Sequence, residues 1–199
     1  MIIDCTAVVM AGGQSRRMGC DKATLRLGEQ TLLQRVVDIV QPLFVELRVS
    51  VRTPRADLPW PQICDRHQDA GPLAGLCAAL EEASTPWIFA LATDMPFVKP
   101  ALIELLAQRR AGCAAVVPVV GGHPQPLTAF YSATCLATVR ALLDETQGGK
   151  RSLRAALNRL DVCYVDDSQL LAADPGLRSF FDLDTPQDLI EAIRSAGGK

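Results

Sequence analysis

The chain has 199 residues, of which 49% are hydrophobic and 21% are charged. This length and composition fit one globular domain with a continuous core, and they exclude wholesale disorder. The 20 basic and 22 acidic residues give a net charge of -2, which argues against a nucleic-acid or anionic-membrane surface as the main partner. Local clusters of Arg and Lys are therefore more informative than the total charge.

The seven cysteines are scattered, and no two of them form a C-x-x-C motif. This usage favours a reducing compartment over a disulfide framework or a structural zinc site. The first residues lack the basic flank of a signal peptide, and no apolar run approaches the ~20 residues needed to cross a bilayer. We therefore expect a cytoplasmic protein without a membrane partner.

Strand and helix patterns alternate along the chain. Strands are predicted up to Met10 and over 44–51, 63–64, 87–92, 114–120, 127–131 and 162–165. Helices are predicted over 31–40, 71–82, 100–110, 134–143 and 152–160, and from Thr185 onward. The continuous apolar run at 87–92 is typical of a central parallel strand. The pattern predicts a three-layer, Rossmann-like α/β fold with an open, mostly parallel sheet and helices on both faces.

A glycine-rich, cationic loop follows the first strand. Its glycines and cations are Gly12, Gly13, Arg16, Arg17, Gly19 and Lys22. Glycines let successive backbone N–H groups form a concave anion site, and the guanidinium and ammonium groups add charge-assisted hydrogen bonds. The loop is therefore predicted to bind a polyphosphate, although a solvated basic loop is the alternative. Its spacing matches neither G-x-x-x-x-G-K-[ST] nor G-x-G-x-x-G.

Residues 11–22, AGGQSRRMGCDK, resemble the pattern A-G-G-x-S-x-R-M-G-x-D-K of the nucleotidyltransferases that act on molybdenum cofactor. Within these nucleotidyltransferases, the motif most resembles that of the molybdenum cofactor guanylyltransferases, which join GMP from GTP to molybdopterin. The resemblance implies GTP and molybdopterin as substrates, Mg²⁺ as cofactor, and transient contacts with cofactor-delivery proteins and molybdoenzymes. It covers the first hundred residues well and the rest in patches. We expect one domain over 1–199, with a nucleotide-binding half at 1–120 and an acceptor-binding half at 121–199.

Asp94 is the predicted metal ligand. It follows the most hydrophobic strand, and ligands of open α/β sheets bind outside such carboxyl ends. Mg²⁺ is held by one or two carboxylates together with substrate phosphates and water. The alternative is that Asp94 caps the turn at Met95 and Pro96. The resembling family has T/C-D-x-P at this place, with the Asp as its magnesium ligand.

Further nucleotide contacts are expected at other strand ends. The backbone of Met10, Ala11 and Gly12 can read the edge of the base, and the resemblance favours guanine. Asp65 follows a short strand and precedes the segment from Gly71 to Gly75, which matches the family's G-P-L-A-G helix start. These two glycines let the positive helix end approach the nucleotide. Ser50 ends the second long strand, where the family has a polar residue that contacts the nucleotide, and a solvated turn is the alternative for Asp65.

The predicted chemistry is nucleotidyl transfer, in which an acceptor phosphate attacks the α-phosphorus of GTP and pyrophosphate leaves. The acceptor phosphate is already ionised, so catalysis depends on positioning and on stabilising charge. We expect Lys22, Arg16, Arg17 and magnesium at Asp94 to share this stabilisation.

The acceptor-binding half gives weaker signals. Lys150 and Arg151 follow two glycines and either hold a second anion or cap a solvated helix. Gln125 matches a family segment beside the acceptor cleft, and Asp182 and Asp184 match a segment implicated on the pterin side. That segment often carries Asn at both positions, and Asp cannot donate the hydrogen bonds that an Asn amide donates.

Three alternatives remain at this stage. The chain could be a CTP-dependent molybdopterin cytidylyltransferase or a sugar-phosphate nucleotidyltransferase, both with the same chemistry. It could also be a GTP-binding accessory protein that delivers the cofactor without catalysis. Pyrophosphate release with each nucleotide and molybdopterin separates these alternatives.

Overall fold

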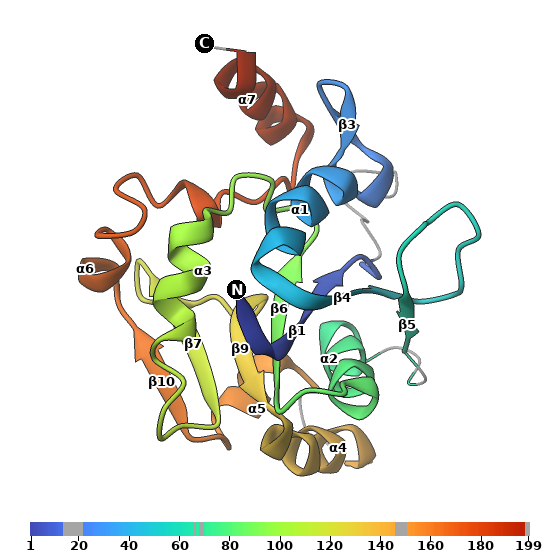
Figure 1. Cartoon of the computed structure of the whole chain (residues 1–199), viewed down its shortest axis with the longest axis vertical. Helices are drawn as coiled ribbons and strands as arrows, with labels where there is room; N and C mark the ends of the chain where they lie inside the picture. The colour runs from blue at the N-terminus through green and yellow to red at the C-terminus, as the bar shows by residue number, and fades with distance from the viewer. Residues whose placement is uncertain (14–21, 66, 68–69, 146–150, 198–199) are drawn as a thin grey trace.

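The computed structural model describes residues 1–13, 22–65, 67, 70–145 and 151–197. Within them, an eight-stranded sheet has the order β10-β7-β9-β6-β1-β4-β5, with β8 paired to β7 (Figure 1). The strands of this sheet are β1 (Ile2–Met10), β4 (Phe44–Val51), β5 (Gln62–Cys64), β6 (Trp87–Ala92), β7 (Ala115–Val120), β8 (His123–Pro124), β9 (Thr128–Ser132) and β10 (Val162–Val165). The helices are α1 (Leu32–Val40), α2 (Pro72–Glu82), α3 (Pro100–Ala107), α4 (Leu136–Asp144), α5 (Leu153–Leu157), α6 (Asp167–Leu170) and α7 (Pro186–Gly197).

The sheet has a parallel half and a mixed half. Strands β6, β1, β4 and β5 are parallel to one another. Strand β9 is antiparallel to both β6 and β7, while β10 is parallel to β7. The carboxyl ends of the four strands in the parallel half therefore meet at one edge of the sheet.

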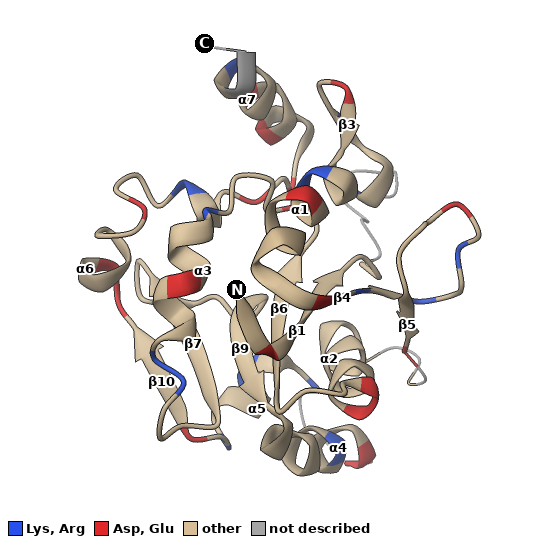
Figure 2. Cartoon of the chain, in the orientation of Figure 1, with Lys and Arg blue, Asp and Glu red and all other residues tan. Residues whose placement is uncertain are grey.

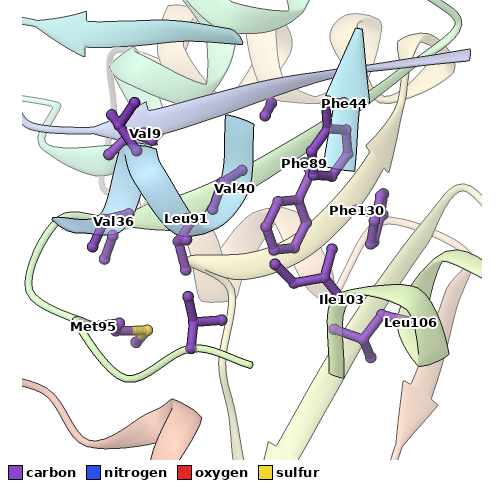
Figure 3. Packing of buried hydrophobic residues seen from close by; sticks show 14 of the residues in the cluster. Val9, Val36, Val40, Phe44, Phe89, Leu91, Met95, Ile103, Leu106 and Phe130 are labelled. Carbon is purple, nitrogen blue, oxygen red and sulfur yellow. The ribbon is translucent and has the colours of Figure 1, made fainter. Parts of the chain in front are cut away.

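Helices cover both faces of the sheet, so the molecule has three layers. Alternate residues of a strand point to opposite faces, and Val9 and Phe89 accordingly lie in one core with Val36 of α1 and Ile103 of α3 (Figure 3). Phe89 also lies against Phe130 in this core, with ring centroids 4.7 Å apart. The intervening strand residues face a second core.

The second core contains Val8 and Ile88 together with buried residues of α2, α4 and α5. Small residues of α2, including Gly75 and Ala78, are buried with it, which lets the helix lie close to the sheet. The predicted α/β architecture with an open, mostly parallel sheet is confirmed.

Local sequence signals explain several helix starts. The hydroxyl of Thr31 accepts a hydrogen bond from the backbone N–H of Gln34 at 3.1 Å and so caps α1. At α7, the Thr185 hydroxyl accepts from the Asp188 N–H, and the Asp188 carboxylate accepts from the Thr185 N–H at 2.6 Å. This reciprocal capping box confirms the predicted helix start.

Some elements differ from the prediction. A short hairpin of β2 (Arg26–Leu27) and β3 (Gln30–Thr31), the strand β8 and the helix α6 were not predicted. The helices predicted over 100–110 and 152–160 end at Ala107 and Leu157. Beyond these ends, i to i+3 hydrogen bonds replace the α-helical pattern, as between the Arg109 N–H and the Leu106 carbonyl.

The charged side chains lie mainly on the helices and loops around the sheet. In the view of Figure 2, basic and acidic residues are interspersed rather than gathered by sign. Among the helices that the structure describes, none has both the length and the apolar character required to span a bilayer.

Candidate functional site

A cleft of about 620 Å³ lies at the carboxyl edge of the parallel half. The ends of β1, β4, β5 and β6 and the start of α2 form its walls. All ten residues predicted to bind the nucleotide line it, namely Met10, Ala11, Gly12, Gly13, Lys22, Ser50, Asp65, Gly71, Gly75 and Asp94. Residues that are up to 84 positions apart in the sequence thus share one cavity, because parallel strands bring their carboxyl ends together.

Part of the predicted phosphate loop lies outside the described residues. Arg16, Arg17 and Gly19 belong to that part, so their predicted roles stay predictions. The described chain resumes at Lys22, the first residue of a short 3-10 turn over Lys22–Thr24.

Lys22 joins the phosphate loop to two carboxylates. Its ammonium group donates a hydrogen bond to Asp94 Oδ2 at 2.7 Å and to Asp184 Oδ1 at 2.6 Å. Burial opposes the charge on Lys22, but the hydrogen bonds and negative charges of Asp184 and Asp94 outweigh it and raise the pKa of this ammonium. Lys22 therefore remains a cation throughout the neutral range, at the place where the end of β6 meets the phosphate loop.

Backbone and hydroxyl contacts fix the position of Asp94. The hydroxyl of the preceding residue, Thr93, donates to the Met10 carbonyl at 2.8 Å, and the Thr93 N–H reaches the same oxygen at 3.3 Å. The Asp94 carbonyl accepts from the Leu183 N–H at 3.0 Å. The end of β6 is thus attached to the end of β1 on one side and to the segment before α7 on the other.

The oxygen donors at this place suit Mg²⁺. A carboxylate such as that of Asp94 is the hard ligand that this ion prefers, with water and substrate phosphates completing its octahedron. The described residues contain no group of three His, Cys, Asp or Glu side chains arranged to hold a metal ion.

The opposite wall of the cleft is closely packed around Gly75. A Cβ atom on Gly75 would lie 2.6 Å from Met10 Cε and 3.0 Å from Ser50 Oγ. The Ser50 carbonyl also accepts from the Ala11 N–H at 2.8 Å, which attaches the start of the glycine-rich loop to the end of β4. Glycine at position 75 thus lets α2 approach the ends of β1 and β4.

Gly71 and Asp65 lie at the far end of the cleft. Gly71 precedes α2 with φ 57°, a conformation that favours glycine. Burial raises the pKa of Asp65, and the positive charges of Arg52 and His67 oppose this shift. Asp65 thus combines a carboxylate and neighbouring cations at the edge of the cavity.

The residues predicted to bind the acceptor are more dispersed. Asp184 reaches the cleft through Lys22, and it does not cap α7, which Thr185 and Asp188 cap. Asp182 is exposed and not part of the cleft lining, and partial burial together with the charge of Asp184 raises its pKa.

Two further acceptor candidates make local contacts elsewhere. Gln125 donates to the His123 carbonyl at 3.3 Å, and Arg151 donates to the Glu145 carbonyl at 3.1 Å. Neither lines the cleft. Lys150 lies outside the described residues.

Six residues that line the cleft were not predicted, namely Ala23, Arg52, Pro72, Ala92, Thr93 and Leu127. Two of them, Arg52 and Thr93, have polar side chains. Both directly follow parallel strands, β4 and β6, whose carboxyl ends form the cleft. The rule that located Asp94 could therefore have located both.

Comparisons with known proteins agree with this geometry. The pattern of the MobA-like NTP transferase domain matches residues 7–162, and the chain belongs to this family. A probable molybdenum cofactor guanylyltransferase of Chloroflexus aggregans is 38% identical over 194 residues, covering 92% of this chain and 91% of the relative. A molybdenum cofactor guanylyltransferase of Desulfosudis oleivorans is 32% identical over 191 residues, covering 94% of this chain and 93% of the relative.

Solved structures show the same fold. The molybdopterin-guanine dinucleotide biosynthesis protein A of Archaeoglobus fulgidus matches with a TM-score of 0.85 and 30% identity, covering 98% of this chain and 100% of its own. The 2-C-methyl-D-erythritol 4-phosphate cytidylyltransferase of Thermus thermophilus matches with a TM-score of 0.69 at 18% identity, covering 96% and 98% of the two chains. The fold is thus that of a nucleotidyltransferase.

Proposed function

We propose that this protein transfers GMP from GTP to molybdenum-molybdopterin, giving the molybdopterin guanine dinucleotide cofactor and pyrophosphate. The observation that carries the proposal is the ion pair between Lys22 and Asp94 in a cleft that all ten predicted nucleotide residues line. A cationic phosphate loop and a metal-binding carboxylate meet there, as transfer from a nucleoside triphosphate requires. Near-full-length relatives named as guanylyltransferases support guanine over the other bases.

The two ends of the cleft bind different parts of the nucleotide. The triphosphate occupies the end with Lys22 and Asp94, and Arg16 and Arg17 stay predicted contributors of positive charge, outside the described residues. The nucleoside occupies the other end, where the backbone of Met10, Ala11 and Gly12 faces the base. Ser50, Asp65, Gly71 and Gly75 complete the contacts at that end.

The reaction needs positioning and charge stabilisation rather than a general base. An oxygen of the acceptor phosphate forms a bond to the α-phosphorus of GTP, and the bond from that phosphorus to the bridging oxygen breaks. Lys22 stabilises the negative charge that spreads over the phosphate oxygens, and the Asp94 carboxylate would hold magnesium. When bound, magnesium supplies charge neutralisation on the triphosphate. Pyrophosphate leaves with the electron pair of the broken bond.

The acceptor approaches from the side of the C-terminal segment. Asp184 supports this placement because it shares the ammonium of Lys22 with Asp94, so the segment before α7 borders the phosphate end of the cleft. Asp182 lies two residues away and responds to the charges of Asp184 and Asp94. Gln125, Lys150 and Arg151 stay predicted acceptor contacts in the half over 121–199 of a single domain, although Gln125 and Arg151 do not line the cleft.

We place the enzyme in the cytoplasm, where GTP and reduced thiols are available. The six described cysteines are all free, which supports a reducing compartment. Product release then involves transient contacts with cofactor-delivery proteins and molybdoenzymes.

Pyrophosphate release tests this function directly. The protein is mixed with molybdenum-molybdopterin, Mg²⁺ and each of GTP, CTP, ATP and UTP in turn. We expect release with GTP, none without acceptor, and none after chelation of Mg²⁺. Release with CTP alone would make the protein a cytidylyltransferase, and GTP binding without any release would make it an accessory protein.

A further inference from the structure

Four neighbouring strand ends place their side chains in one row along the cleft. Met10 of β1 pairs with Ala92 of β6 on one side and with Ser50 of β4 on the other, and Ser50 pairs with Ile63 of β5. Extending this register by two residues beyond each of these positions gives a row of Asp94, Gly12, Arg52 and Asp65. All four residues line the cleft.

The spacing of this row sets where a nucleotide lies. Neighbouring strands are about 4.8 Å apart, so Arg52 lies roughly two spacings, or about 10 Å, from the Asp94 position. That separation is comparable to the length of an extended nucleoside monophosphate. With the α-phosphate at Lys22 and Asp94, the ribose and base therefore extend over Gly12 toward Arg52 and Asp65.

The side chain of Arg52 is available for a ligand. Its stem lies beside the glycine-rich loop, with Cγ 3.5 Å from the place of a Cβ on Gly12. Arg52 is exposed, and within the described ranges no hydrogen bond or ion pair involves its guanidinium group. Arg55 in the same loop contrasts with it, because Asp57 accepts from Arg55 Nη2 at 2.7 Å. The nearby opposite charge on Arg52 is the carboxylate of Asp65, which its positive charge influences without a hydrogen bond, and both residues line the cleft.

We propose that Arg52 determines the base specificity by donating two hydrogen bonds to O6 and N7 of guanine. A guanidinium group presents paired donors, and these two guanine acceptors match them. Adenine offers a donor at N6 beside N7, and cytosine offers a donor at N4, so both mismatch this pair. The triphosphate is the other possible target of a guanidinium, but it lies at the Lys22 end of the row. This inference rests on the proposed function, which supplies GTP as the substrate.

Atomic substitution in the nucleotide tests the contact. GTP, 7-deaza-GTP and ATP are titrated in Mg²⁺ into the wild type, Arg52→Ala and Arg52→Gln, with heat of binding as the readout. We expect Arg52→Ala to weaken GTP binding by about tenfold to a hundredfold, the range for loss of a bidentate base contact. Removing N7 should weaken binding to the wild type severalfold and have no effect on binding to Arg52→Ala.

Two variants sharpen the result. Arg52→Gln should shift the preference toward ATP, since a Gln amide matches N6 and N7 of adenine. Arg55→Gln is the matched control, because it removes a charge from the same loop at a position that does not line the cleft, and it should leave the GTP affinity unchanged.

The inference is overturned if 7-deaza-GTP binds the wild type as tightly as GTP, a result that requires no variant to fold. It is also overturned if replacing GTP by 7-deaza-GTP weakens binding to Arg52→Ala by the same factor as binding to the wild type. In both cases GTP still binds and the proposed function stands. If the wild type binds no GTP in the presence of Mg²⁺, the proposed function itself is wrong, and the inference fails with it.

Discussion

The parallel half and the mixed half of the sheet differ in how they bring polar residues together. In the parallel half, β6, β1, β4 and β5 all end at the same edge, and the residues after them form a continuous cleft lining. In the mixed half, β9 runs the other way, so its start rather than its end lies at that edge. Leu127, just before β9, accordingly lines the cleft and accepts from the Ala92 N–H at 2.8 Å.

This difference bears on the two substrate sides that we propose. The proposed nucleotide side is built by strand ends whose positions follow from the sheet register. The proposed acceptor side is built by long segments, such as the one that brings Asp184 to Lys22, 162 residues away in the sequence. We therefore expect substitutions in the parallel half to affect nucleotide chemistry, and those in the C-terminal segment to affect stability or acceptor use.

The largest effect is expected from the ion pair at the phosphate end. Lys22→Met or Asp94→Asn should lower the rate of pyrophosphate release by on the order of a hundredfold or more, because each removes an electrostatic stabiliser of the transition state. The control is Asp161→Asn, because Asp161 is an exposed carboxylate before β10, at the opposite edge of the sheet from the cleft. This variant should retain full activity. Equal rates of pyrophosphate release for Asp94→Asn and this control would show that Asp94 has no role in the reaction.

A buried carboxylate in the C-terminal segment should affect stability instead. Asp174 is fully buried, lies 2.8 Å from Lys99 Nζ and accepts from the Ser179 N–H at 2.7 Å. Burial opposes the charge on Asp174, but the hydrogen bonds from Lys99 and Ser179 outweigh it and lower its pKa. Asp174→Asn should lower the free energy of unfolding by about 2 kcal/mol at neutral pH, the scale of a hydrogen bond to a charged group.

The pH dependence of this loss follows from the direction of the shift. A lowered folded pKa gives stability that is complete above the unfolded value and is lost as pH falls through the folded value. Urea unfolding should therefore show a gap between wild type and Asp174→Asn that narrows below about pH 4. A difference in unfolding free energy that stays constant across this pH range would contradict the role of the Asp174 charge. If Asp174→Asn kept its full stability but bound GTP more weakly, the C-terminal segment would affect nucleotide binding, contrary to our expectation.

Asp184 should give a smaller effect that depends on pH. Asp184→Ala removes one acceptor of the Lys22 ammonium and should lower kcat/KM for the acceptor by about tenfold. Asp184→Asn should recover part of this loss at neutral pH, since its amide oxygen still accepts from Lys22. Both variants lower the pKa of Lys22, because Asp184 helps to raise it. The alkaline limb of the pH–rate profile should therefore move to lower pH, and an unmoved limb would show that Lys22 does not control it.

The smallest effect is expected at Gly75. In Gly75→Ala, the new methyl group would press on Met10 Cε, a flexible side-chain end, and on Ser50 Oγ. Displacing Met10 into the cleft should weaken GTP binding by about fivefold, with a stability loss of about 1 kcal/mol from overpacking. Gly176→Ala is the control, since its methyl group would meet Arg178 Cγ at an ordinary 3.5 Å. Unchanged GTP affinity in Gly75→Ala would show that the base does not contact the wall of the cleft around Gly75 and Met10.

The fold and ten residues of the cleft lining were accessible from the sequence because their signals are local. An apolar run such as 87–92 identifies a buried strand, and a polar residue directly after it, such as Asp94, lies at the ligand-binding edge. Thr31 and Thr185 identify helix starts by hydrogen bonds within one turn.

Other features depend on contacts that no local pattern encodes. Apolar residues at 127–131 predict a strand but not its antiparallel direction, and the hairpin of β2 and β3 has strands of only two residues. The partner of Asp184 is distant in sequence, so its pairing with Lys22 needed the folded chain.

A crystal structure of the protein with GTP and Mg²⁺ tests the central claim most directly. The account predicts the triphosphate within hydrogen-bonding distance of Lys22 Nζ, the metal ion on the carboxylate of Asp94, and the guanine base at the Arg52 end of the cleft. A nucleotide bound with its triphosphate away from Lys22 and Asp94 would contradict it.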